Sequence, residues 1–293
     1  MRRIRTYADL QGPDRSGLDQ QVEAQHERVA RRLEGIGTVL AVTSGKGGVG
    51  KSLVAATLAS ALVRRGLRGG LLDADLNGPS APAFLGLSRP TLEVTDDGVV
   101  PPSDGRGLRV MSTDLLMDER APLRWREPGT GGHLWRSLLE RGVFREFLSD
   151  VVWGRLDVLV VDTPPGPQRL AELKELAPNR TCVLGVTIPT SASRTAVERS
   201  LRLAVEGGLL LLGLVENMAG YVCPACREVG PLHPGEAGES IARALGTPLL
   251  GRVPFDAEAA ACAERGDMEG LLSSRAGREI GRLADVVAEG LGS

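Results

Sequence analysis

The sequence predicts an α/β fold in which a mostly parallel sheet is covered by helices on both faces. Short apolar runs alternate with helical segments along most of the chain, as expected for parallel strands joined by helical crossovers. The runs are rich in Val, Leu and Ala, which is typical of strands buried on both faces. With 293 residues, of which 42% are hydrophobic and 25% charged, the chain can bury the core of such a domain.

A charged helical stretch over residues 18–33 comes first, and we interpret residues 1–36 as a loosely attached N-terminal arm or surface helix. Residues 37–293 are then expected to form a single domain. Strands are predicted at residues 39–43, 70–72, 156–161, 182–187, 209–215 and 249–253. Helices are predicted at residues 53–65, 134–148, 192–205 and 276–291. Residues 88–132 contain many Pro and Gly and predict an insertion or a long hairpin.

The charge balance and the absence of targeting patterns limit the cellular setting. The net charge is -2, from 35 basic and 37 acidic residues, so no overall positive field exists to attract nucleic acid or an anionic membrane. No apolar window is long enough to cross a bilayer, and no signal-peptide pattern follows the basic start. We therefore expect a cytoplasmic protein with reduced thiols, and with neither nucleic acid nor membrane as a partner.

A glycine-rich loop between the first strand and the following helix predicts a phosphate-binding site. It matches the pattern G-x-x-x-x-G-K-[ST] through Gly45, Lys46, Gly47, Gly48, Val49, Gly50, Lys51 and Ser52. The glycines allow backbone N–H groups to surround phosphate oxygens, and the following helix directs its positive end at the same anion. Lys51 is expected to neutralise the β- and γ-phosphates, and Ser52 to supply a hydroxyl to Mg²⁺. The loop therefore predicts a protein that binds and hydrolyses ATP.

Lys46 is an addition that the general pattern does not require. It cannot easily reach the phosphates of its own chain if Lys51 already occupies that place. One interpretation is that Lys46 reaches the phosphates of a neighbouring chain and acts like an arginine finger supplied in trans. The other interpretation is a solvated lysine without a catalytic role.

Acidic residues end two of the predicted strands beside this loop. Asp162 is a candidate to hold Mg²⁺ through water, and the loop after it, residues 163–166, is a candidate sensor of the γ-phosphate. Asp73 is a second candidate for Mg²⁺ through water, and Asp75 is a candidate to orient the attacking water. Each of these residues could instead cap a helix or form a turn. Their shared position at the carboxyl ends of strands predicts that they converge on one site with the loop.

Cys223 and Cys226 form a C-x-x-C pair in a loop after the strand that is expected to end near residue 217. A metal or cluster site, a redox dithiol and a structural accident are all compatible with the pair alone. Two thiolates cannot complete a tetrahedral zinc site or hold a four-iron cluster, each of which usually takes four ligands. Cys182 and Cys262 lie in apolar segments and are expected to be buried. Missing ligands would then come from another molecule, such as the second pair of a twofold dimer.

Taken together, these motifs resemble those of the Mrp-type iron–sulfur carrier ATPases, a branch of the ParA/MinD-like P-loop proteins whose loop carries the extra lysine. The resemblance covers nearly the whole chain from residue 39 to residue 267. The matching segments are residues 44–52, 72–80, 110–112, 125–126, 153–157, 162–166, 216–220, 223–226 and 248–256. This ordered series is far more specific than the phosphate loop alone, which many ATPases share.

The resemblance implies a homodimer with ATP at the interface and Lys46 reaching across it. It implies that Cys223 and Cys226 of both chains together hold one bridging [4Fe-4S] cluster, which is labile and is passed to recipient apoproteins. It also implies that Asn217 contacts the adenine base and that Pro254 lies near it.

Several positions depart from the family pattern. Leu53, which we place among the nucleotide-binding positions, stands where a Thr is common, so one α-phosphate contact is expected to be lost. The Pro-Gln-Arg run at residues 167–169 replaces Thr-Gly-Asp, which could change hydrolysis or its coupling to the cluster. Asn77 replaces a common Tyr, and Glu127 and Arg227 each replace a common Gly.

Two other functions remain open at this stage. A partitioning or positioning switch of the ParA/MinD type would bind DNA or a membrane as a nucleotide-dependent dimer, but it gives the cysteine pair no role. The last helix, residues 276–291, mixes basic and acidic residues in the manner of a helix packed on the sheet rather than of a membrane anchor. A regulatory protein that binds ATP without hydrolysing it is supported only by the altered segment after Gly166.

Overall fold

The computed structural model describes residues 18–87, 92–116 and 132–291. The strands are β1 (Ile36–Thr43), β2 (Gly69–Asp73), β3 (Glu93–Thr95), β4 (Gly98–Val100), β5 (Arg109–Ser112), β6 (Leu156–Asp162), β7 (Thr181–Thr187), β8 (Leu210–Val222), β9 (Val229–Gly230) and β10 (Leu249–Phe255). Among these residues, one eight-stranded sheet has the order β10-β8-β7-β1-β6-β2-β5, with β9 paired to β8. All pairs along this order are parallel, and β9 is antiparallel to β8. β3 and β4 form a separate antiparallel hairpin.

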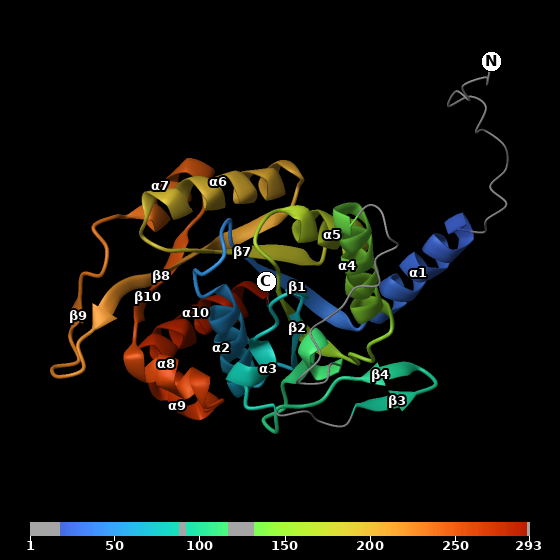
Figure 1. The fold of residues 1–293 in the computed structure, drawn as a ribbon, viewed down its shortest axis with the longest axis horizontal. Helices are drawn as coiled ribbons and strands as arrows, with labels where there is room; N and C mark the ends of the chain where they lie inside the picture. Colours follow the sequence, from blue (N-terminus) through green and yellow to red (C-terminus); the bar gives the residue numbers. More distant parts are fainter. Residues whose placement is uncertain (1–17, 88–91, 117–131, 292–293) are drawn as a thin grey trace, which may run out of the picture.

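Helices cover both faces of this sheet (Figure 1). One face carries α1 (Leu18–Leu33), α4 (Gly132–Ser149), α5 (Gln168–Leu176), α6 (Ser191–Glu206) and α7 (Ala237–Leu245). The other carries α2 (Lys51–Arg64), α3 (Ala81–Phe84), α8 (Ala257–Glu264), α9 (Met268–Ser273) and α10 (Arg275–Leu291). A short 3₁₀ helix, η2 (Thr113–Leu116), follows β5. The parallel sheet with two helical layers confirms the predicted fold class.

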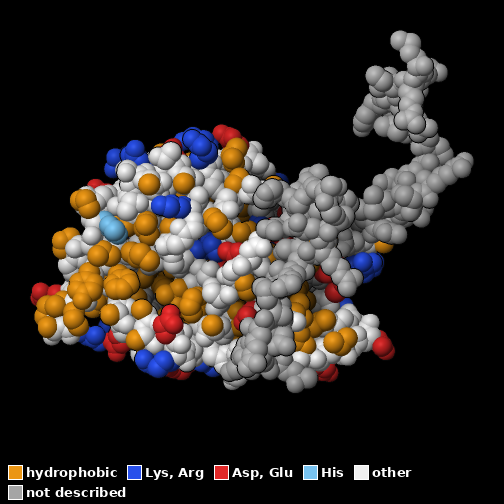
Figure 2. Space-filling view, in the orientation of Figure 1, with side chains coloured by type: hydrophobic (Ala, Val, Ile, Leu, Met, Phe, Trp, Pro, Cys, Tyr) orange, Lys and Arg blue, Asp and Glu red, His pale blue; other side chains and the backbone are white. Residues whose placement is uncertain are grey.

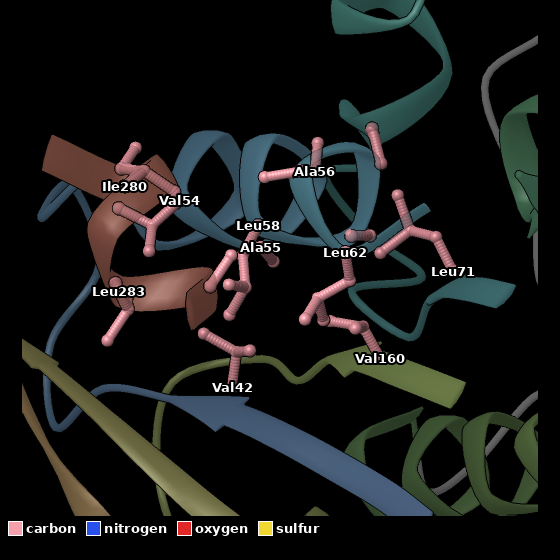
Figure 3. Close-up of a cluster of buried hydrophobic side chains, with 14 of the residues drawn as sticks. Val42, Val54, Ala55, Ala56, Leu58, Leu62, Leu71, Val160, Ile280 and Leu283 are labelled. Atoms are coloured by element: carbon pink, nitrogen blue, oxygen red, sulfur yellow. The ribbon is translucent and has the colours of Figure 1, made fainter. Parts of the chain in front are cut away.

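Alternation along the central strand β1 supplies both halves of the core. Leu40 and Val42 pack into the cluster beneath α2 and α10, whereas Val39 and Ala41 pack into the cluster on the opposite face. All four side chains are fully buried, as expected for a strand between two helical layers. Figure 3 shows the first cluster, with labels on Val42, Val54, Ala55, Ala56, Leu58, Leu62, Leu71, Val160, Ile280 and Leu283. The carboxyl end of β1 is thereby fixed from both sides.

Each predicted strand and helix is present among the described residues, but β8 is longer than expected. It continues to Val222 instead of ending near residue 217, because Tyr221 and Val222 pair with β9. The cysteine pair therefore lies at the turn of a β8–β9 hairpin rather than in a free loop. Periodicity did not reveal this extension, since residues 216–220 include polar residues and a glycine.

The prediction of an insertion or a long hairpin over residues 88–132 is met only in part, because the described residues form a short hairpin of β3 and β4, with three residues in each strand, and also an unpredicted strand. β5 pairs in parallel with β2 at the edge of the main sheet. Its four residues are too few to give a clear period. Trp125, Arg126 and Glu127 of the family motifs lie outside the described residues, as does the arm over residues 1–17.

The second half of α1 is anchored more firmly than the sequence suggested. Val29 and Leu33 are 0% and 2% exposed and belong to the same apolar cluster as Phe144 and Trp153. The two residues are four apart and so lie on one face of the helix. Sparse apolar positions are therefore sufficient to fix this part of α1 to the domain.

Candidate functional site

The glycine-rich loop connects β1 to α2 at the carboxyl edge of the sheet. Gly50 has a φ of 75°, a left-handed conformation that favours glycine, and a Cβ there would lie 2.3 Å from Nδ2 of Asn217. A Cβ at Gly45 would lie 2.1 Å from the backbone of Ala196 in α6. Around residues 47–48, by contrast, no described atom beyond the adjacent residues lies within 4 Å of a Cβ built there. The loop is thus packed at its two ends and open in the middle, where a phosphate group fits.

Lys51 and Asp162 form a buried ion pair at the first turn of α2. Nζ of Lys51 donates a hydrogen bond to Oδ1 of Asp162 and lies 3.4 Å from Oγ of Ser52. Lys51 is 6% exposed and Asp162 is 0% exposed. The register of β1 and β6, which pairs Val42 with Asp162, sets the carboxylate beneath the loop. A phosphate that binds Lys51 therefore competes with this carboxylate for the ammonium group.

Asp162 has an oxygen available for a further ligand. Burial raises the pKa of its carboxyl above the ordinary value, and the charge of Lys51 partly offsets that effect. Its second oxygen, Oδ2, is buried and has no hydrogen-bond partner among the described residues. A buried carboxylate oxygen is normally hydrogen-bonded or coordinated, so an unpartnered one indicates a place for a ligand, and Mg²⁺ prefers oxygen ligands. Asp162 and the hydroxyl of Ser52 could therefore hold a hydrated Mg²⁺.

Asp73 lies beside Asp162, with which it is paired in the register of β2 and β6. Its carboxylate is 1% exposed and accepts hydrogen bonds from the backbone N–H groups of Ser80 (2.9 Å), Ala81 (3.0 Å) and Asp75 (3.2 Å). Burial and the charge of Asp162 raise the pKa of Asp73 to about 7, against the effect of the three N–H groups. Through these hydrogen bonds Asp73 fixes the backbone of residues 75–81 after β2. Asp75 is half-buried and lies two residues after Asp73.

The protein free of metal and nucleotide is expected to lose stability as the pH rises from about 4 to about 7. A carboxyl whose pKa is raised by folding holds its proton more tightly when folded, so the free energy of unfolding falls while that proton is lost. Asp73, raised from 3.8 to about 7, contributes to this window. The fall should be about 1 kcal/mol or more. Urea unfolding across this range measures it, and Asp73→Asn should flatten the profile. The same slope in that variant would contradict the assignment.

Lys46 and Leu53, the other two candidate residues in and after the loop, differ in their exposure. Lys46 is exposed, and in the part of the chain that the structure describes its ammonium group makes no ion pair. Its backbone carbonyl accepts a hydrogen bond of 2.8 Å from the Ser44 hydroxyl, so the loop is held through its backbone while the ammonium stays accessible. Leu53 packs against the core beneath α2 and brings no polar side-chain group to the loop.

Asn217 and Pro254 lie together at the end of the loop. Nδ2 of Asn217 donates a hydrogen bond of 2.8 Å to the carbonyl of Val49, and Asn217 is only 7% exposed. Asn217 is paired with Val253 in the register of β8 and β10, so Pro254 follows directly beside it. The contact of these two residues with a base stays a prediction.

The cysteine pair occupies the turn of the β8–β9 hairpin. Cys223 is half-buried and Cys226 is exposed, whereas Cys182 and Cys262 are buried, as expected. The N–H of Arg227 donates to the carbonyl of Cys223, and Arg227 has a φ of 64° at the position where the family commonly has Gly. The turn therefore brings two thiols to one exposed tip of the molecule.

The environment of the pair favours a metal ligand. Hydrogen bonds from the backbone N–H groups of Cys226 and Ala225 lower the pKa of the Cys223 thiol, and the thiolate is the form that binds metal. Within the described residues, no group of three or more His, Cys, Asp or Glu side chains is placed to hold a metal ion. One chain thus offers two ligands, and a four-coordinate site needs others.

Apolar side chains surround this hairpin. Val229, Leu232 and Phe255 are 46%, 39% and 38% exposed. Figure 2 shows hydrophobic side chains gathered at the end of the molecule where Figure 1 places β9. An exposed apolar surface of this kind around a functional group suits contact with another protein.

The loop after β6 is followed by an arginine whose burial was not predicted from the sequence. Arg169 is 5% exposed, and its guanidinium donates to Glu172 and to the backbone carbonyl of Glu140 in α4 (3.1 Å). It also lies 4.7 Å above the ring of Phe144. The Asp that the resemblance to the Mrp-type carriers implies at this position could not donate these hydrogen bonds. Arg169, in the segment that departs from the family pattern, thus connects α5 to α4. The three-residue spacing of Arg169 and Glu172 on a helix is the feature of the sequence from which their ion pair could have been predicted.

No helix in the described part of the chain is long and apolar enough to cross a membrane. α10 packs on the sheet and does not form a membrane-surface anchor of the MinD type. Its Ile280, Leu283 and Val287 are at most 2% exposed and belong to the core beneath α2. This packing is the one that the mixed charge pattern predicts.

Comparison with known proteins identifies the family. A model of ParA-type proteins described as the NUBPL iron-transfer P-loop NTPase matches residues 35–289. The chain belongs to this family. It is therefore a P-loop NTPase, and the match extends from the start of the sheet through the cysteine hairpin to the last helix.

Relatives and solved structures agree with this assignment. The iron-sulfur cluster carrier protein of Methanocaldococcus jannaschii is 35% identical over 90% of this chain and 89% of its own length. The cytosolic Fe-S cluster assembly factor NUBP2 of Mus musculus is 37% identical over 80% of this chain and 84% of its own length. A nucleotide-binding protein of Archaeoglobus fulgidus, solved in complex with ADP, has a TM-score of 0.69 and 34% identity, covering 83% of this chain and 92% of its own. The septum site-determining protein MinD of Pyrococcus horikoshii shares the fold, with a TM-score of 0.58 at 18% identity, over 87% of this chain and 97% of its own.

Proposed function

We propose that this protein is an ATP-hydrolysing carrier that holds a [4Fe-4S] cluster between two copies of the chain and transfers it to apoproteins. The observation that carries the proposal is the pair of Cys223 and Cys226 at the tip of the β8–β9 hairpin on a P-loop NTPase of the iron-transfer family. The names of the relatives, an iron-sulfur cluster carrier and a cytosolic Fe-S assembly factor, support both the cargo and a cytosolic location.

The nucleotide half of the proposal assigns a role to each loop group. ATP binds over residues 45–52, with Lys51 on the β- and γ-phosphates and Asn217 and Pro254 at the base. Ser52 and Asp162, with Asp73 behind them, hold a hydrated Mg²⁺, which neutralises phosphate charge. Asp75 orients the attacking water, and Lys46 acts on the partner's nucleotide. The buried Lys51–Asp162 pair and the free Oδ2 of Asp162 support this arrangement.

The cysteine half follows from ligand count. A four-iron cluster takes four thiolates, and one chain offers two at the hairpin. A twofold axis at the tip brings a second identical pair, so the homodimer completes the site. The apolar side chains around the hairpin support burial of this tip against another protein. Apo iron–sulfur proteins are then the recipients.

Iron and acid-labile sulfide content tests the proposal. After anaerobic purification and reconstitution, the wild-type protein should carry about four irons per dimer, because four thiolates hold one four-iron cluster. Cys223→Ala should lose this iron because two of the four thiolates are gone. Cys262→Ala is the matched control, since Cys262 is buried in the Ala-rich helix α8 and is not available as a ligand, so its removal should leave the iron content unchanged.

Zinc, or no metal at all in the wild type, would refute the carrier. What would then remain is a nucleotide-dependent switch of the ParA/MinD type, which the likeness of fold to MinD allows. A turnover assay on the same preparations separates an ATPase from a protein that only binds ATP. Slow phosphate release above the level of Lys51→Ala establishes hydrolysis, and equal rates would leave a regulatory nucleotide-binding protein.

A further inference from the structure

One strand, β8, joins the phosphate loop to the cysteine hairpin. Asn217 donates its hydrogen bond to Val49 of the loop, and Cys223 follows the last residue of the same strand. At about 3.3 Å per residue of fully extended strand, the two sites are at most roughly 20 Å apart along β8. Figure 1 shows β8 running from the sheet into the hairpin with β9. A change at the loop can therefore reach the thiols along this strand.

β8 is irregular between the two sites. Asn217 is paired with Val253 and Tyr221 with Phe255, so four residue steps on β8 match two on β10. The extra residues form a bulge, which bends a strand and interrupts its ladder. Within it Met218 has a φ of 53°, a left-handed conformation that a residue with a long side chain rarely adopts. Such strained backbone persists only where its surroundings hold it in place.

The terminal methyl group of Met218 lies beside the Gly50 end of the phosphate loop. A Cβ built on Gly50 would be 3.8 Å from Cε of Met218 and 2.3 Å from Nδ2 of Asn217. Gly50 is the N-cap of α2, next to Lys51. Two consecutive residues of β8 thus border the side of Gly50 on which a side chain would lie, and Asn217 also holds the loop through its hydrogen bond to Val49, so a shift of the loop toward β8 moves these residues.

Beyond the bulge the β8–β9 hairpin contacts β10 and α8. The rings of Tyr221 and Phe255 are stacked, with centroids 6.3 Å apart, and Arg227 forms an ion pair with Glu258 of α8. A Cβ at Gly220 would lie 2.8 Å from the carbonyl of Gly230, so the two strands of the hairpin are in close contact. Bending is then concentrated at the bulge rather than in the hairpin.

We infer that Met218 is a positioning residue that transmits the nucleotide state of the phosphate loop to the cysteine pair through the bulge over residues 218–220. Nucleotide at the loop shifts Gly50, Met218 follows, and the hairpin changes the accessibility of Cys223 and Cys226. The inference rests on the proposed function only for the cargo of the thiols, since the coupling itself acts in the protein without a cluster.

Thiol reactivity of the full-length apoprotein tests this coupling. The alkylation rates of Cys223 and Cys226 by iodoacetamide are followed by peptide mass spectrometry, with and without saturating Mg-ADP. In the wild type the nucleotide should change these rates about fivefold or more, the usual lower range for coupled sites. Cys182 and Cys262, which are buried, report any global unfolding in the same samples.

Three variants distinguish transmission from a general structural role. Met218→Asn keeps the left-handed backbone, which Asn tolerates, but cannot reach Gly50, so the nucleotide effect should fall below about twofold. Met218→Leu keeps an apolar side chain of similar size and should retain most of the effect. Asn179→Gly relaxes another left-handed residue, far along the chain in the turn before β7, and should behave like wild type. Titration with ADP checks that each variant is saturated.

An unchanged nucleotide effect in Met218→Asn, or none in the wild type, would overturn the inference. Both results are independent of the iron measurement. A wild-type protein without iron refutes cluster carriage and leaves the thiol coupling standing, whereas four irons per dimer with nucleotide-independent thiols refutes the coupling alone.

Discussion

Replacing Lys51 by Met should lower ATP turnover by about 10²-fold or more, since the change removes the one cation that is buried at the loop among the residues that the structure describes. Lys51 lies at the first turn of α2 with Asp162 as its partner, so its ammonium is held beside the glycine-rich loop, where we propose that the β- and γ-phosphates bind. Charge stabilisation in such a site is strong because little water screens it. Phosphate release under saturating Mg-ATP measures the effect.

The same substitution should also destabilise the protein without nucleotide. It leaves the carboxylate of Asp162, which is 0% exposed, without its cation. Removal of one partner of a buried pair costs about 3 kcal/mol or more when the other stays charged. The loss should be smaller near pH 5 than near pH 8, because burial raises the pKa of Asp162 and the carboxyl can then take up a proton.

Lys174→Met is the matched control for both measurements. Lys174 lies on α5 and donates a hydrogen bond of 2.7 Å to the carbonyl of Gly208 at an exposed position. Its replacement should leave turnover within about twofold and cost about 1 kcal/mol of stability. Equal turnover in Lys51→Met and Lys174→Met would remove Lys51 from the catalytic site.

The parts of the site that could be predicted from sequence are those fixed by local geometry. A strand, a glycine-rich loop and a helix follow one another within residues 36–64, so spacing alone places Lys51 and Ser52. Asp73 and Asp162 could be assigned to the same edge because parallel strands end together there. The structure brings both carboxyls next to the loop.

The remaining features depend on contacts between distant segments. β8 continues to Val222 because β9 pairs with it, and no run of apolar residues marks that extension. Arg169 can be buried because its guanidinium pairs with Glu172, stacks on the ring of Phe144 and donates to a carbonyl of α4. From sequence alone, a charged residue is ordinarily expected to be exposed. The left-handed conformation of Met218 has no sequence signal at all, since the residue type argues against it.

Lys46→Gln should lower ATP turnover by about 10³-fold if Lys46 acts like an arginine finger, because the charge that stabilises the transition state is then missing. Its ammonium is exposed and its backbone carbonyl is held by Ser44, so the substitution should leave the loop and the affinity for ADP nearly unchanged. Turnover and ADP affinity measured on the same variant separate a catalytic role from a role in binding. A variant with full turnover would leave Lys46 as a solvated lysine.

Mixing two inactive variants decides whether Lys46 acts in trans. In a dimer of Lys46→Gln with Lys51→Met, the Lys46→Gln chain keeps its own Lys51 and receives an intact Lys46 from its partner, so one of the two sites is complete. Random pairing in a twofold dimer should therefore restore about a quarter of wild-type turnover. If Lys46 served its own chain, both sites of the mixed dimer would be defective and no activity would return. Recovery thus requires that each nucleotide site be built from two chains, which is the same twofold arrangement that would bring four cysteines together at the hairpin tips.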